Sequence, residues 1–162
     1  MDWKRLIFLN SLVAVAYFLT AWLLLPLAMM PTNAVPVWLP AGIAMAAVLI
    51  WGYRLLPAAF IGDFLVGWQI YTPLDTSGWW LCVLLGSQAV LHAWLGRFLL
   101  QKFAVWPSAL KADNEIVRFF LLAGLVAALP PALVSIGLQS YFIELLQTQW
   151  WQTLLIWWMG SA

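Results

Sequence analysis

Residues 38–71 read WLPAGIAMAAVLIWGYRLLPAAFIGDFLVGWQIY, and this stretch decides the fold class. As one helix it would be about 50 Å long at 1.5 Å per residue, whereas the hydrocarbon core of a bilayer is about 30 Å thick. Residues 52–54 interrupt the apolar run, and Pro57 follows where a second helix would begin. The stretch therefore predicts a tight hairpin of two membrane helices, over about residues 38–53 and 55–71.

The composition of the whole chain also predicts a membrane protein. Apolar residues make up 65% of the 162 positions and charged residues 8%, against about half and about a quarter in soluble domains. Many of the thirteen tryptophans stand in clusters at the ends of apolar runs, which is typical of the aromatic belt at a membrane interface. A net charge of +1 gives no basic surface for nucleic acid. We therefore expect the lipid bilayer, and no nucleic acid, as a partner.

Four further apolar runs flank the hairpin. They cover residues 6–30, 79–100, 116–138 and 150–162. A span needs about 20 residues, so the first three runs are long enough and the last is not. We predict an all-α integral membrane protein, a multi-span helical bundle with five complete spans and a sixth truncated at the C-terminus. Pro130 and Pro131 predict a break or kink in the fifth span.

The charged residues indicate how the spans are oriented. With the N-terminus in the cytoplasm, the basic residues all fall on the cytoplasmic side, namely Lys4, Arg5, Arg54, Arg97, Lys102, Lys111 and Arg118. The opposite side holds Asp75 and Glu144. This distribution follows the positive-inside rule. We predict a multi-pass protein of the inner (cytoplasmic) membrane with a cytoplasmic N-terminus.

Asp63 is the residue most indicative of function. It lies nine positions after Arg54 in the third run, roughly 13 Å from the inner boundary of the membrane. A carboxylate at that depth is energetically costly and by default marks a functional site facing the bundle interior. It could contact a ligand, carry a proton or act as a switch. The alternative is a hydrogen-bonded side chain that pins two helices together.

Three more polar side chains lie at a similar depth. His92, the only histidine, is in the fourth run, and the geometry of neighbouring antiparallel helices allows a pair with Asp63. Gln88 lies one turn from His92 on the same face, and Asn10 lies in the first run. They could line a small pocket, or serve only as structural groups that hydrogen-bond between helices. We predict a ligand-binding or switch site of Asp63, His92, Gln88 and Asn10.

Neither catalysis nor metal binding is predicted for this chain. HExxH, P-loop and nucleophile-elbow motifs are missing from the sequence. The single cysteine, Cys82, lies in an apolar run, and no second histidine accompanies His92. We expect no cofactor, no metal and no enzymatic activity within these residues.

The hairpin resembles the signature of MASE1, a family of membrane-associated sensor domains. The matching positions are Trp38, Pro40, Gly42, Gly52, Arg54, Pro57 and Gly62. Residues 86–88, 113–118 and 157–160 also look like the family, so the resemblance covers most of the chain.

The resemblance implies one sensory domain over residues 1–162, corresponding to the N-terminal part of a domain of about eight spans, each needing about 20 residues. Such domains precede histidine kinases of two-component systems, or the diguanylate cyclases and phosphodiesterases of cyclic di-GMP signalling. The implied partners are a cytoplasmic output module, a second copy of the chain and an unidentified small ligand. Two alternatives stay open: a small transporter or substrate-binding membrane subunit, and a scaffold that only anchors a partner.

Overall fold

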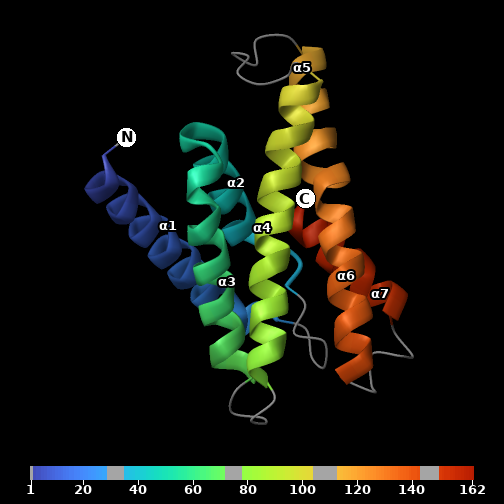
Figure 1. The fold of residues 1–162 in the computed structure, drawn as a ribbon. Helices are drawn as coiled ribbons and strands as arrows, with labels where there is room; N and C mark the ends of the chain where they lie inside the picture. Colours follow the sequence, from blue (N-terminus) through green and yellow to red (C-terminus); the bar gives the residue numbers. More distant parts are fainter. Residues whose placement is uncertain (1, 29–34, 72–77, 104–112, 143–149) are drawn as a thin grey trace.

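The computed structural model describes residues 2–28, 35–71, 78–103, 113–142 and 150–162, and every regular element in these ranges is helical (Figure 1). The elements are α1 (Trp3–Leu24), η1 (Leu25–Leu27), α2 (Leu39–Trp51), η2 (Tyr53–Leu55), α3 (Leu56–Tyr71), α4 (Gly78–Lys102), α5 (Asp113–Phe119), η3 (Phe120–Val126), α6 (Ala127–Phe142) and α7 (Trp150–Ser161). The prediction of an all-α, multi-span membrane bundle is confirmed.

Helix length separates the described spans into two groups. Three stretches are long and apolar enough to cross a bilayer: Trp3–Leu27, Gly78–Lys102 and Asp113–Gly137. The hairpin helices are shorter, with 13 residues in α2 and 16 in α3, or about 20 and 24 Å. They are short because Pro40 opens α2, while Gly52 ends it and Pro57 lies in the first turn of α3.

The predicted hairpin turn is present and has a clear physical basis. Gly52 adopts φ 86°, which a residue without Cβ tolerates best, and its N–H donates to the Val48 carbonyl at 2.9 Å. Arg97 of α4 donates from Nη1 to the carbonyls of Val48 and Leu49, at 2.5 and 2.7 Å. Its guanidinium also lies 5.1 Å from the ring centroid of Tyr53. Arg97 thus adds a charged donor to two carbonyls in the last turn of α2, of which Val48 also accepts from the Gly52 N–H.

Glycines bring three helices into close contact. A Cβ on Gly62 of α3 would lie 2.7 Å from the Tyr17 Cβ on α1, and one on Gly86 of α4 would lie 2.9 Å from the Phe60 carbonyl of α3. Small residues at such positions let membrane helices approach closely. Figure 1 accordingly shows α3 lying beside both α1 and α4.

The break or kink expected at Pro130 and Pro131 is not found as a break, because both prolines lie inside the continuous helix α6. The departure from α geometry instead precedes them, in the π-helical η3. In a regular α-helix a proline ring collides with the carbonyl four residues earlier. For Pro130 that residue is Val126, the last of η3. We interpret the wider π turns as the adjustment that admits the prolines without a break.

The described basic residues lie toward one end of the bundle. At that end α1, α3 and α5 begin while α2 and α4 end (Figure 1). The residues concerned are Lys4, Arg5, Arg54, Arg97, Lys102 and Arg118. Lys111, Asp75 and Glu144 fall outside the described residues. We call this the basic end; its assignment to the cytoplasm stays a prediction.

Candidate functional site

A cavity of about 90 Å³ lies between the helices. Its lining comes from α1, α2, α3, α4, α6 and α7, so it forms only when the whole bundle is assembled. One water needs about 10–15 Å³ on this measure, so the cavity has room for about six to nine waters or a small ligand. Its main polar and aromatic lining residues are Tyr17, Trp38, Asp63, Gln88, His92 and Trp157.

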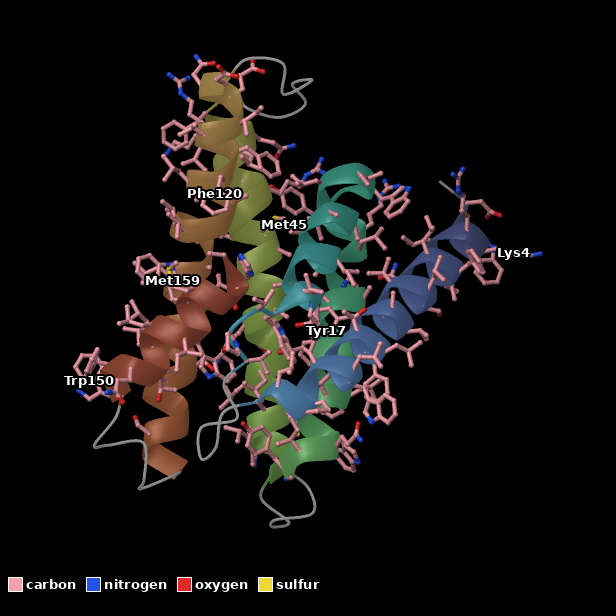
Figure 2. All side chains as sticks on the ribbon, turned by 180° about the vertical axis from the view of Figure 1, so that it is seen from behind. Lys4, Tyr17, Met45, Phe120, Trp150 and Met159 are labelled. Carbon is pink, nitrogen blue, oxygen red and sulfur yellow. The ribbon has the colours of Figure 1, made fainter. Side chains whose placement is uncertain are left out.

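Asp63 enters the cavity from α3 and is held by α1. The hydroxyl of Tyr17 donates to Asp63 Oδ1 at 2.9 Å and accepts a hydrogen bond from Trp38 Nε1 at 3.2 Å. Tyr17 is only 2% exposed, and it can lie against α3 because residue 62 has no Cβ. Figure 2 shows Tyr17 inside the bundle, whereas Lys4 and Trp150 lie at its edges. The carboxyl group is therefore positioned by a buried phenol, which is itself fixed by an indole.

Trp38 extends this connection to the last helix. Its backbone N–H donates to the Gly160 carbonyl of α7 at 2.6 Å. A Cβ on Gly160 would lie 2.4 Å from the Val35 carbonyl, so the two segments approach this closely only with glycine at position 160. Asp63, Tyr17, Trp38 and Gly160 thus form a continuous connection from α3 through α1 and the start of α2 to α7.

His92 and Gln88 face the same cavity from α4. His92 is 7% exposed, and its Nε2 lies 3.3 Å from the Ala123 carbonyl in η3. This hydrogen bond requires the proton on Nε2, which in a neutral ring leaves Nδ1 as an acceptor. Gln88 is 8% exposed, and within the described part of the chain its amide has no hydrogen-bond partner. Both side chains therefore keep hydrogen-bonding capacity for a molecule in the cavity.

The structure brings three of the four predicted site residues together and places the fourth elsewhere. Asp63, His92 and Gln88 line one cavity, although Asp63 is bonded to Tyr17 while His92 is bonded to Ala123. Asn10 instead donates to its own helix and, at 3.2 Å, to the Arg54 carbonyl. Asn10 therefore ties α1 to the hairpin turn near the basic end.

The sequence reasoning missed Tyr17 and Trp157, and it treated Trp38 only as a motif position. A signal was available for Tyr17, because tyrosines in spans are enriched at the interface and this one lies near the middle of α1. A buried phenol at that depth needs a hydrogen-bond partner. Trp157 gave no such signal, since it belongs to a run of tryptophans that also suits an interface.

The chemistry available at the cavity is hydrogen bonding, one carboxyl group and aromatic surface. Among the described residues, no group of three His, Cys, Asp or Glu side chains is placed to hold a metal ion. Cys82 is buried in α4 and its thiol donates to the Gly78 carbonyl at 3.1 Å. The site is therefore suited to binding rather than to covalent chemistry.

Comparison with known families gives one clear match. The sequence profile of the MASE1 family matches residues 8–162, which include the hairpin and all the described residues that line the cavity. Curated proteins and solved structures gave no match. Because the profile covers nearly the whole chain, the chain belongs to the MASE1 family of membrane sensor domains.

Proposed function

We propose that this chain is the sensory input domain of a bacterial signalling protein and relays the occupancy of its central cavity to a cytoplasmic output module. Membership of a sensor family supports a sensory role. The observation that carries the proposal is the hydrogen-bonded connection that leads from Asp63 in the cavity to α7. Through this connection, a change at the Asp63 carboxyl group would alter the contacts of α7.

The relay would act through a shift in helix packing. A ligand that takes Asp63 Oδ1 displaces the Tyr17 hydroxyl from that oxygen, and Tyr17 also holds the Trp38 indole. Trp38 contacts α7 through its backbone. A ligand shifts such an equilibrium only if it binds the two packings with different affinity. Competition for Asp63 supplies that difference, because only one packing keeps the Tyr17 hydrogen bond.

The direction of α7 suits transmission toward the basic end. This helix starts beside α6 in the half of the bundle away from the basic end, and it runs back into the interior (Figure 1). With the basic end in the cytoplasm of an inner-membrane protein, α7 is directed toward the compartment that holds the output. That output would be a histidine kinase or an enzyme of cyclic di-GMP turnover, the classes implied by the family resemblance, working as a dimer.

The test uses Tyr17→Phe in the full-length protein, in membranes, with autophosphorylation and cyclic di-GMP turnover as readouts. The variant removes one hydroxyl and disconnects Asp63 from Trp38, so we expect basal output to change about tenfold, equivalent to about 1.4 kcal/mol. Tyr53→Phe is the matched control, because the Tyr53 hydroxyl bonds to Gln101 at the exposed hairpin turn. Equal output from both variants, at equal amounts in the membrane, would refute the relay.

The structure does not confirm one of the two features that favoured the transporter alternative. It depended on Asp63 near the midplane and on a helix broken at Pro130 and Pro131. Asp63 does line the cavity, but α6 runs through both prolines without a break. Uptake of a solute into proteoliposomes that contain the purified protein would establish the transporter function.

A further inference from the structure

We propose that the cavity binds a small organic ammonium cation. The inference depends on the proposed function, since it names the chemical class of the stimulus for the same cavity. Three features carry it: the charge of the lining, the aromatic side chains around Asp63 and the free hydrogen-bonding groups of α4.

The charged groups that line the cavity favour a cationic ligand. Asp63 is the only carboxylate among the described residues that line the cavity, and no lysine or arginine is present there. Its one described hydrogen bond comes from the neutral phenol of Tyr17. A buried carboxylate is stable when a positive group offsets its charge. Since the lining supplies no such group, a cationic ligand would provide the counter-charge for an ionised Asp63, which an anionic ligand could not do.

The aromatic lining suits an ammonium group in particular. Tyr17, Trp38, Tyr71 and Trp157 all border the cavity, and they come from α1, α3, α7 and the residue preceding α2. The faces of such rings attract organic cations when the charge lies within about 6 Å of the ring centroid, and tryptophan is the strongest partner. A cavity lined by Asp63 and four aromatic residues offers both a counter-charge and a surface for the methyl or methylene groups of the ligand.

The polar groups of α4 set further requirements. Gln88 is 8% exposed without a hydrogen bond in the described ranges, and His92 keeps one ring nitrogen free of its bond to Ala123. These groups can accept from or donate to a hydroxyl on the ligand. The space for about six to nine waters limits the ligand to about six to nine non-hydrogen atoms. A small amino alcohol or its methylated form meets these conditions.

The route by which a ligand would reach the cavity is compatible with a positive charge on that ligand. The lining includes Leu25, Val35 and Tyr71, which lie where α1 ends, before α2 begins and where α3 ends. In Figure 1, α1 and α3 end on the side of the bundle away from the basic end. A positively charged ligand approaching from that side would not pass the described lysines and arginines.

The first experiment uses radiolabelled choline with the full-length protein in lipid nanodiscs, read out by scintillation proximity. Unlabelled choline, its neutral isostere 3,3-dimethylbutan-1-ol and the anion 3,3-dimethylbutanoate serve as competitors. We expect saturable choline binding, displacement by the neutral isostere about tenfold weaker than by choline, and no displacement by the anion. Absence of saturable binding, or equal competition by the neutral isostere, would overturn the proposal. This comparison needs no variant to fold.

The second experiment locates the site. Asp63→Asn and Trp157→Leu should each weaken choline binding about tenfold or more. Trp94→Leu should leave it unchanged, because Trp94 is on the outward face of α4 at 41% exposure. Equal binding by wild type and Asp63→Asn would place any choline site outside this cavity and refute the proposal.

The two proposals fail in different ways. If choline does not bind while Tyr17→Phe still alters output, the ligand class is wrong and the sensory relay stands. If choline binds in the cavity but neither choline nor Tyr17→Phe changes output, the ligand class stands and the sensory relay falls.

Discussion

The hydroxyl of Tyr17 donates to Asp63 Oδ1 at 2.9 Å, joining α1 to α3 across 46 positions of sequence. The same hydroxyl accepts from the Trp38 indole. The Asp63 carboxyl group inside the bundle is therefore held in place by the Tyr17 hydroxyl, which is itself hydrogen-bonded to Trp38.

Gly62→Ala should destabilise the bundle by about 1–3 kcal/mol, the usual range for overpacking. The added methyl group would lie 2.7 Å from the Tyr17 Cβ, so α1 must move away from α3. The midpoint of thermal unfolding in detergent measures the effect. Gly42→Ala is the control, since a Cβ there has nothing within 4 Å; an equal or smaller loss in Gly62→Ala would contradict the packing described.

Gly160→Ala should alter the signalling output of the protein that remains folded in the membrane. Its methyl group would lie 2.4 Å from the Val35 carbonyl and displace α7 from the segment that leads into Trp38. Output activity per folded protein in membranes is the readout. Gly137→Ala provides the comparison, because position 137 is exposed and has space for the methyl group. Unchanged output in Gly160→Ala would show that this contact does not transmit the signal.

Arg97→Leu should lower the free energy of unfolding by about 1–3 kcal/mol, because the carbonyls of Val48 and Leu49 lose a charged donor. Denaturant titration of the purified protein measures this. The control Lys102→Leu also removes a positive charge from α4, but at an exposed position. A loss of the same size in both variants would mean that charge alone, and not capping of α2, stabilises the turn.

Topology can be read by labelling single cysteines in a Cys82→Ser background. Arg54→Cys, at the hairpin turn, should react with a membrane-impermeant maleimide only from the cytoplasmic side. Thr76→Cys, between α3 and α4, should react only from the opposite side. Labelling in the reverse sense would overturn the orientation on which the direction of signalling depends.

The helices and the turn were predictable because they depend on local composition. Apolar runs bounded by Gly52, Arg54 and Pro57 gave the hairpin, and the cost of a carboxylate in a membrane singled out Asp63. His92 and Gln88 followed from the same polarity argument. These inferences use one helix at a time, so they needed no knowledge of how helices pack.

The contacts between helices were not predictable in the same way. The approach of Tyr17 to Asp63, and of Trp38 to Gly160, depends on the tilt and rotation of each helix, which periodicity in a nearly all-apolar span does not define. The π turns of η3 were missed, because the sequence predicts strain at Pro130 and Pro131 but not where the backbone absorbs it. Asn10 gave the same polar signal as Gln88, yet it lies at the hairpin turn.

If Asp63 acts on the output through Tyr17, a double-mutant cycle of these two residues will show it. Output is measured for wild type, Asp63→Asn, Tyr17→Phe and the double variant, each in the full-length protein at equal membrane amounts. Residues in one hydrogen-bonded network show a coupling of about 0.5–3 kcal/mol, so we predict that the double variant behaves like either single variant. Effects of the two substitutions that simply add would contradict the account.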